Sequence, residues 1–208
     1  MKRKTAIICD FDGTMTVKDI GDSILKHFKI ANAQEIEKSY SLQTNFEKWM
    51  REKFKKLTAK PQEIEKYVLS IVQMRRGASD LIKFCKQNSI PFEIVSGGVD
   101  VYAEPILKKL KIKVKSFFGR ARYSSDGYVL EYPFLDEKIT LAQFKMNRVQ
   151  SYHRKGMRVI FCGDGTSDLK AAKAADLVYA TKKLLKLCKE KKIKCLPLVT
   201  FSSLQKSL

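Results

Sequence analysis

The sequence predicts an α/β fold with a mostly parallel sheet that helices cover on both faces. Short apolar runs alternate along the chain with segments whose apolar residues recur at helical spacing. The runs at 5–9 and 158–162 are apolar without alternation, as expected of central strands that are buried on both sides. With 208 residues, 44% of them hydrophobic and 30% charged, the chain can bury a full core, as one domain or as a large and a small one.

The strands follow from these apolar runs. They are predicted at "TAIICDF" (5–11), "PFEIVSG" (91–97), "KVKSFFG" (113–119), "MRVIFCGD" (157–164) and "DLVYAT" (176–181), with a last short one in "CLPLVTF" (195–201). The segment "RARYSSDGYVLEY" has two alternating runs about Asp126-Gly127, which predicts a β-hairpin and a small insertion.

One region breaks the alternation of strands and helices. Residues 17–75 contain helical patterns around "DIGDSILKHF", "AQEIEKSY", "NFEKWMREKF" and "PQEIEKYVLSIV". Pro61 is well placed for the first turn of the last of these helices. A helical block of this length is too long for an ordinary crossover between strands. We therefore predict a core of residues 1–16 and 76–208, with residues 17–75 inserted as a helical unit.

Composition limits the classes of partner and compartment. The net charge is +19, with 41 Lys and Arg against 22 Asp and Glu, which makes an anionic partner plausible. No aromatic and basic motif accompanies the charge, so a small phosphorylated molecule is favoured over nucleic acid. No apolar run approaches the roughly 18 residues of a membrane span, and we expect a cytoplasmic protein. The five cysteines are odd in number and lack CxxC spacing, which favours reduced thiols.

Polar clusters stand at the carboxyl-terminal ends of three of the predicted strands. They are "DFDGT" (10–14), "SGG" (96–98) and "GDGTSD" (163–168). Ligand sites of parallel sheets lie at the carboxyl ends of the strands, so the three clusters are expected to converge. Lys145, in the helical segment before the last cluster, is a fourth contributor.

The expected convergence explains why acidic residues stand at the rim of a core. Asp10, Asp12, Asp164 and Asp168 would concentrate negative charge that needs a cation. Carboxylate oxygens without a nearby Cys or His favour Mg²⁺. Lys145, Ser96 and the N–H groups of Gly97 and Gly98 would face an anion, and the helix start after "SGG" favours phosphate. An ionised carboxylate, a metal and a phosphate site together indicate phosphoryl transfer to aspartate.

These motifs, in this order, resemble those of the haloacid dehalogenase-type (HAD) phosphohydrolase superfamily. The resemblance covers nearly the whole chain and implies a Rossmann-like core. A helical insertion directly after the first motif is similar to the cap of the phosphoserine phosphatase-like subgroup. Within that subgroup, "MRRGASDLIKFCKQNSIPFEIVSGGVD" and "LLKLCKEKKIKCLP" resemble most the methionine-salvage phosphatases that act on a hydroxy-keto-methylthiopentenyl phosphate.

The resemblance implies roles for the first motif. Asp10 matches the nucleophile that forms an aspartyl-phosphate. Asp12 matches the general acid that protonates the leaving oxygen and then serves as base for water. An acid at this position favours a phosphatase over a dehalogenase. Gly13, which permits the sharp turn, and Thr14 match the phosphate-binding part of the motif.

The other motifs match the phosphate and metal sites of the family. Ser96, Gly97 and Gly98 match the donors to phosphoryl oxygens, and Lys145 matches the lysine that offsets the charge of nucleophile and phosphate. The residues that match the Mg²⁺ site are Asp10, the backbone carbonyl of Asp12, Asp164 and, directly or through water, Asp168.

The substrate is less determined than the chemistry. Asp19 stands where phosphoserine phosphatases carry a Glu at the cap entrance, and Arg51 is a candidate for their cap arginine. Asp19 is alternatively the N-cap of a helix. Trp49, Phe46 and Phe54 form the core of the cap, or one of them contacts an apolar substrate tail. We predict a phosphatase of a small metabolite, either a methionine-salvage-type sugar-like phosphate or a phosphoserine-like compound, acting as a monomer or homodimer. The alternatives are a phosphotransferase or phosphomutase, or a basic nucleic-acid-binding module.

Overall fold

The sheet of the molecule is mostly parallel, as predicted. The computed structural model describes residues 4–41 and 43–208. Its seven strands have the order β4-β3-β2-β1-β5-β6-β7, and every neighbouring pair is parallel except β3 with β4. The strands are β1 (Thr5–Cys9), β2 (Phe92–Val99), β3 (Lys115–Ser124), β4 (Gly127–Glu131), β5 (Arg158–Gly163), β6 (Leu177–Ala180) and β7 (Cys195–Pro197). The predicted α/β fold is confirmed.

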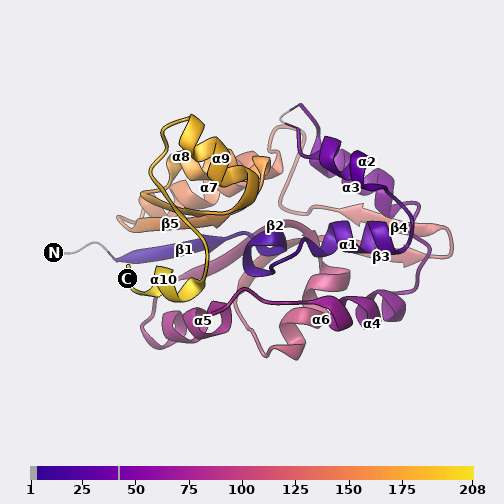
Figure 1. Ribbon diagram of the computed structural model, residues 1–208, viewed down its shortest axis with the longest axis horizontal. Helices are drawn as coiled ribbons and strands as arrows, with labels where there is room; N and C mark the ends of the chain where they lie inside the picture. The colour runs from indigo at the N-terminus through magenta and orange to yellow at the C-terminus, as the bar shows by residue number, and fades with distance from the viewer. Residues whose placement is uncertain (1–3, 42) are drawn as a thin grey trace.

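Helices cover both faces of this sheet. They are α1 (Ile20–His27), α2 (Ala33–Ser39), α3 (Phe46–Phe54), α4 (Pro61–Ile71), α5 (Ala78–Gln87), α6 (Asp100–Lys109), α7 (Leu141–His153), α8 (Leu169–Ala174), α9 (Lys182–Glu190) and α10 (Phe201–Gln205). Figure 1 shows α7, α8 and α9 above the sheet and α5, α6 and α10 below it. Within the described residues, no helix has the length and apolar character of a membrane span.

The central strand β1 shows why its sequence is continuously apolar. Ile7 and Cys9 belong to the apolar cluster on one side of the sheet, whereas Ala6 and Ile8 belong to the cluster on the other. Successive side chains of a strand point to opposite faces, and all four side chains are fully buried. A strand covered on both faces therefore needs apolar residues at every position.

Helices α1 to α4 lie beyond the carboxyl ends of the central strands, on the side of the molecule away from both termini (Figure 1). Their starts follow from local sequence: Asn32 and Glu35 form a capping box at α2, and Pro61 opens α4. The two chain segments that lead into and out of this group run side by side, because Thr16 and Met74 form a β-bridge. We refer to residues 17–75 as the cap.

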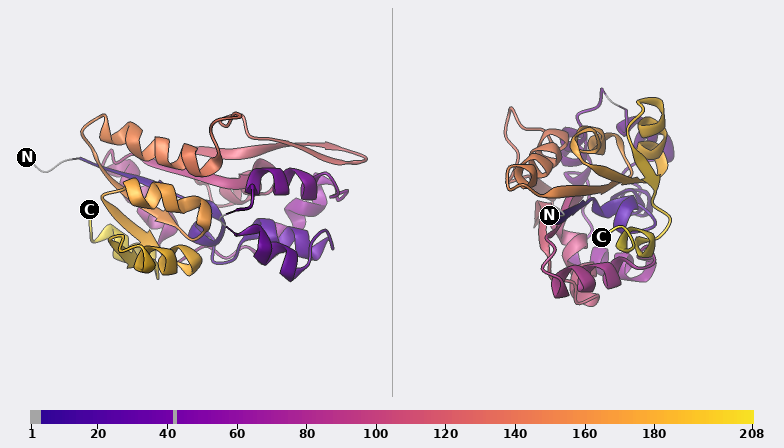
Figure 2. Two further views of the ribbon diagram at one scale, coloured as in Figure 1. Left: turned by 90° about the horizontal axis from the view of Figure 1, so that it is seen from above. Right: turned by 90° about the vertical axis from the view of Figure 1, so that its left-hand side faces the viewer.

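The β3–β4 hairpin differs from the prediction in its extent. β3 begins at Lys115 and continues without interruption to Ser124, so the expected strand and the first arm of the hairpin are one element. The hairpin extends alongside the cap helices (Figure 2). Tyr128 donates a hydrogen bond to the carbonyl of Ala59 at 2.8 Å. Gly127 has a φ of 121° and lies so close to Lys55 that a Cβ would be 2.1 Å from its carbonyl oxygen, which leaves room only for glycine.

Candidate active site

The turn after β1 brings two aspartates into one crevice. The chain turns sharply over Phe11–Met15, with Gly13 at a φ of 71°. A Cβ on Gly13 would lie 2.1 Å from Oδ2 of Asp164 and 2.2 Å from Nζ of Lys182. The glycine is therefore required both for the left-handed backbone and for the close approach of these two side chains. Asp10, directly before the turn, and Asp12, within it, both line the same cavity.

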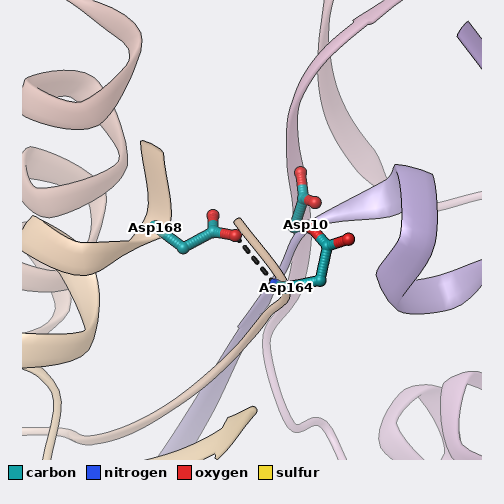
Figure 3. Close-up of side chains that lie close together, drawn as sticks. All are labelled: Asp10, Asp164 and Asp168. Atoms are coloured by element: carbon teal, nitrogen blue, oxygen red, sulfur yellow. Dashed lines mark hydrogen bonds between the residues drawn. The ribbon is translucent and has the colours of Figure 1, made fainter. Parts of the chain in front are cut away.

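Three carboxylates from two strand ends lie close together. Asp10 follows β1, and Asp164 and Asp168 follow β5. One oxygen of each lies within 4.8 Å of the others. Figure 3 shows the side chains of Asp10 and Asp164 next to each other, with Asp168 turned toward the backbone of Asp164. The parallel pairing of β1 with β5 sets this arrangement, because it places their carboxyl ends side by side.

Lys145 connects two of these carboxylates from helix α7. Its Nζ donates to Oδ1 of Asp10 at 2.9 Å and to Oδ1 of Asp168 at 2.6 Å. The side chain is only 1% exposed. Burial would lower the pKa of Lys145, but the charges of Asp10 and Asp168 raise it well above its ordinary value. Lys145 is therefore a permanent cation next to Asp10.

Asp168 is fully buried, and both oxygens of its carboxylate accept hydrogen bonds from the protein. Besides the bond from Lys145, its Oδ2 accepts the backbone N–H groups of Asp164 and Gly165, each at 2.9 Å. Asp168 thus fixes the loop after β5 and the position of Lys145.

Burial and mutual repulsion dominate the electrostatics of this cluster. Burial raises the pKa of Asp10 to about 6, although Lys145 opposes the shift. Burial and the charge of Asp10 raise the pKa of Asp164 well above its ordinary value. A divalent cation that prefers oxygen ligands fits these residues, because it would offset the repulsion that raises both pKa values.

Asp12 has an environment different from that of Asp10. Its Oδ2 accepts a hydrogen bond from the Tyr102 hydroxyl at 2.7 Å, and its Oδ1 accepts the N–H of Ile20 at 3.1 Å. Burial, together with the charge of Asp19, raises the pKa of Asp12 well above its ordinary value. A carboxyl group that holds a proton more tightly than usual suits an acid that donates to a leaving group.

Two glycines near the end of β2 let neighbouring side chains approach the backbone closely. A Cβ on Gly98 would lie 2.3 Å from Oδ2 of Asp12, and one on Gly97 would lie 2.7 Å from Phe46. The N–H of Gly98 donates to the buried Ser96 hydroxyl at 2.9 Å. The three residues Ser96, Gly97 and Gly98 line the same cavity as the carboxylates of Asp10 and Asp12.

The cavity has a volume of about 500 Å³ and lies between the strand ends and the cap. Its inner end contains the catalytic candidates described above. Its outer part is lined by cap side chains that include Tyr40, Phe46 and Met50. Such a cavity suits a small molecule with one charged end and a less polar remainder.

Asp19 caps a helix and also lines the cavity. Its Oδ1 accepts the N–H of Asp22 at 2.8 Å, which caps α1. It also lines the cavity, and its Oδ2 accepts a hydrogen bond from the Tyr40 hydroxyl at 3.0 Å.

Three other predicted binding residues lie outside the cavity lining. Gly13 shapes the turn, and the Thr14 hydroxyl lies behind Asp10, 3.4 Å from its Oδ2. Arg51, the predicted candidate for a substrate contact, is directed away from the cavity in this structure. Its Nε donates to the carbonyl of Leu130, and its guanidinium lies 5.4 Å from the ring centre of Tyr132. Arg51 is directed to the hairpin because β4 passes along α3.

The sequence prediction missed several residues that contact the site. The Arg75 guanidinium donates to the carbonyls of Gly13 and Thr14, at 3.0 and 2.8 Å. Lys182 donates to Oδ2 of Asp164 at 3.0 Å. Lys182 directly follows the predicted strand 176–181, so the same strand-end rule could have found it, whereas Arg75 lies in a connecting segment that gave no signal.

Known proteins resemble this chain in sequence along nearly its whole length. The sequence profile of the haloacid dehalogenase-like hydrolases matches residues 7–173. The chain is 30% identical over 207 residues to a 2-hydroxy-3-keto-5-methylthiopentenyl-1-phosphate phosphatase of Lysinibacillus sphaericus (strain C3-41), covering 95% of this chain and 91% of the relative. It is also 30% identical to the protein of that name from Bacillus velezensis, covering 97% of this chain and 88% of the relative.

Among solved structures, the fold resembles that of phosphoserine phosphatases. A substrate-bound phosphoserine phosphatase superposes with a TM-score of 0.78 at 23% identity, over the whole of both chains. A phosphoserine phosphatase in apo form gives a TM-score of 0.72 at 25% identity, over 99% of this chain and 98% of the other.

Proposed function

The chain belongs to the haloacid dehalogenase-like hydrolase family, and we propose that it is a Mg²⁺-dependent phosphatase that uses Asp10 as nucleophile. The activity that family and relatives share is that of a phosphoric monoester hydrolase. One observation carries the proposal: the Asp10 carboxylate, the Lys145 ammonium and the carboxyl of Asp12 meet at the inner end of one cavity. The substrate is a small phosphorylated metabolite.

The first half of the reaction forms a phosphoenzyme. A carboxylate oxygen of Asp10 attacks the phosphorus, and the bond from phosphorus to the ester oxygen breaks. Asp12 gives its proton to that oxygen, so the product leaves as a neutral alcohol or enol. Lys145 stays bonded to Asp10 and offsets negative charge, while the Ser96 hydroxyl and the N–H of Gly97 donate hydrogen bonds to the phosphoryl oxygens.

The second half releases phosphate. Asp12, now ionised, takes a proton from water as the water oxygen attacks the phosphorus of the aspartyl-phosphate. The acyl phosphate bond breaks, and Asp10 returns as a carboxylate. Tyr102 holds the Asp12 side chain throughout, through its 2.7 Å hydrogen bond.

The proposed metal site consists of Asp10 and Asp164, with the backbone carbonyl of Asp12 as a further ligand and Asp168 behind them. When bound, Mg²⁺ would supply electrostatic stabilisation to the phosphoryl oxygens. The chemistry of the donor set, with oxygen atoms from carboxylates, supports magnesium.

The cavity favours an uncharged substrate body over phosphoserine. A phosphoserine-like substrate presents a carboxylate besides its phosphate, and the candidate arginine for that carboxylate, Arg51, is bonded to the hairpin instead. Tyr40, Phe46 and Met50 line the outer cavity and suit an apolar tail. The names of the relatives agree with this choice, so we propose a methionine-salvage-type keto-pentenyl phosphate as the substrate.

We further propose that the cap, residues 17–75, closes over the substrate as a unit on the core formed by 1–16 and 76–208. The segments 15–19 and 75–78 are the proposed hinges. Glu47 of α3 accepts the N–H of Leu141 at the start of α7, which gives the closed cap a contact with the helix that carries Lys145.

The test is turnover of an aryl phosphate with and without Mg²⁺. Asp10→Asn removes the nucleophile, and we expect a loss of kcat of about a thousandfold or more. Asp126→Asn, in the exposed hairpin turn, is the matched control and should retain wild-type rates. Equal rates in the Asp10→Asn and wild-type proteins would refute the proposal.

Two alternatives give different results in related assays. A phosphotransferase would transfer the phosphoryl group to an added alcohol in preference to water, which product analysis detects. A nucleic-acid-binding module would bind polynucleotide at low salt and release it steeply as salt rises. A metabolite panel that contains phosphoserine and the keto-pentenyl phosphate distinguishes the substrates.

A further inference from the structure

Lys182 brings a second ammonium group to the carboxylate cluster. Its Nζ lies 3.0 Å from Oδ2 of Asp164. The Asp164 side chain is 15% exposed and that of Lys182 is 43% exposed. Both groups lie directly over Gly13, since a Cβ there would contact each of them within 2.2 Å. The ion pair is therefore part of the packing around the turn after β1.

The backbone of Lys182 is strained, and the strain has no explanation in the helix itself. Among the described residues, the non-glycine residues with positive φ are Lys29, Ser89, Lys111, Lys182 and Lys192. Four of them follow the ends of α1, α5, α6 and α9, where a left-handed residue commonly terminates a helix. Lys182 is the exception, because it is the first residue of α9 and has a φ of 44°. Strained residues of this kind concentrate at functional sites.

The charge balance of the cluster indicates what Lys182 does. Lys145 donates to Asp10 and Asp168. Lys182 donates to the third carboxylate of the cluster, that of Asp164. Without Lys182 the cluster would carry one more unit of negative charge, and its attraction for a cation would be stronger.

On the basis of the proposed function, we propose that Lys182 is a positioning residue that weakens Mg²⁺ binding while it holds Asp164 in place. In the metal-free protein its ammonium group keeps Asp164 directed toward Gly13. When Mg²⁺ arrives, that ammonium group competes for the carboxylate of Asp164 and repels the incoming ion. The concentration of Mg²⁺ at which the site fills is thus set partly by a residue that does not touch the substrate.

The test measures metal binding rather than turnover. Metal-free protein is titrated with MgCl₂, and binding is followed by calorimetry and by the thermal denaturation midpoint. Lys182→Asn removes the charge and is chosen because asparagine adopts positive φ readily. Lys182→Met keeps an unbranched side chain. Both should bind Mg²⁺ about tenfold more tightly than wild type, since one repelling charge near a divalent ion is removed.

Two control variants separate the effect of the Lys182 charge on Mg²⁺ binding from the effect of a structural change. Lys182→Arg keeps the positive charge, and Lys186→Met removes an exposed lysine one turn farther along α9. Each should bind Mg²⁺ within about twofold of wild type. The arginine variant keeps the charge at position 182, and the charge removed at Lys186 is distant, exposed and screened by solvent. Equal or weaker binding by both neutral Lys182 variants overturns the inference. A wild-type protein that does not bind Mg²⁺ overturns the metal dependence of the proposed function and this inference with it.

Discussion

Helix α7 contacts two buried carboxylates through residues one turn apart, and the electrostatic environments of the two carboxylates differ. Toward the start of the helix, Lys145 donates to Asp10. One turn later, Arg148 makes a two-pronged ion pair with Glu93 of β2, with N–O distances of 2.9 and 2.8 Å. Tyr152 adds a hydrogen bond to the same carboxylate at 2.8 Å. The side chains of Asp10 and Glu93 are only 8% and 2% exposed.

The pKa values of the two carboxylates move in opposite directions. Burial would raise the pKa of Glu93, but the hydrogen bonds from Arg148 and Tyr152 lower it below its ordinary value of 4.5. Burial raises the pKa of Asp10 to about 6 even though Lys145 is bonded to it. The protein thus satisfies the charge of Glu93 by itself, whereas Asp10 shares Lys145 with Asp168. We infer that the first site is structural and the second is arranged for a ligand.

Replacing the two cations of α7, Lys145 and Arg148, should distinguish the two sites most clearly. Lys145→Met is expected to reduce kcat on an aryl phosphate about a thousandfold, because it removes the fixed positive charge beside the nucleophile. Arg148→Met is expected to leave kcat within about threefold of wild type. Steady-state kinetics on folded protein measure both. A comparable loss of kcat in the two variants would contradict the division into a catalytic and a structural site.

The structural site should determine stability instead. Removing one partner of a buried ion pair costs about 3–5 kcal/mol, and Arg148 keeps a fifth of its side chain exposed. We therefore expect Glu93→Gln to lower the free energy of unfolding by about 2–3 kcal/mol at pH 7. Urea denaturation followed by circular dichroism measures the difference. Glu190→Gln, an exposed residue at the end of α9, is the control and should change little.

The effect of Glu93→Gln on the free energy of unfolding should also depend on pH. Because the folded-state pKa of Glu93 lies below its ordinary value, the stabilisation is present above about pH 4.5 and is lost as the pH falls through the folded-state pKa. The gap in unfolding free energy between wild type and Glu93→Gln should therefore narrow as the solution is acidified from pH 6 to pH 3. If the difference in unfolding free energy increased on acidification, the pKa of Glu93 would be shifted in the opposite direction.

The sequence predicted the parts of this molecule that depend on short stretches of chain. The continuous apolar run of β1 is dictated by burial on both faces, and the start of α4 by Pro61. The catalytic candidates Asp10, Ser96 and Asp164 were predicted because parallel strands bring their carboxyl ends to one edge. Each of these inferences uses residues that are adjacent in sequence or a rule about sheet topology.

The contacts that were missed join segments far apart in the chain. Arg75 binds the carbonyl of Thr14, and Tyr102 binds Asp12; no spacing within either segment specifies its partner. The continuous β3 was divided in two because Gly119 interrupts its apolar pattern. In the structure, a Cβ there would lie 2.8 Å from the Tyr132 ring, so this glycine admits a neighbouring side chain and does not end the strand.

Arg51 provides the smallest expected effect, and it extends the comparison to the cap. Like Arg148, it is bound by the protein itself, through the carbonyl of Leu130 and the ring of Tyr132. Arg51→Met should therefore change kcat/KM for the keto-pentenyl phosphate by less than about threefold and stability by about 1 kcal/mol, the range of a cation–π contact and one hydrogen bond. If the loss of kcat/KM were instead a hundredfold and specific to substrates with a carboxylate, Arg51 would have to turn into the cavity during turnover. The cap would then recognise the charge of the substrate, and the preference that we infer for an uncharged substrate body would be wrong.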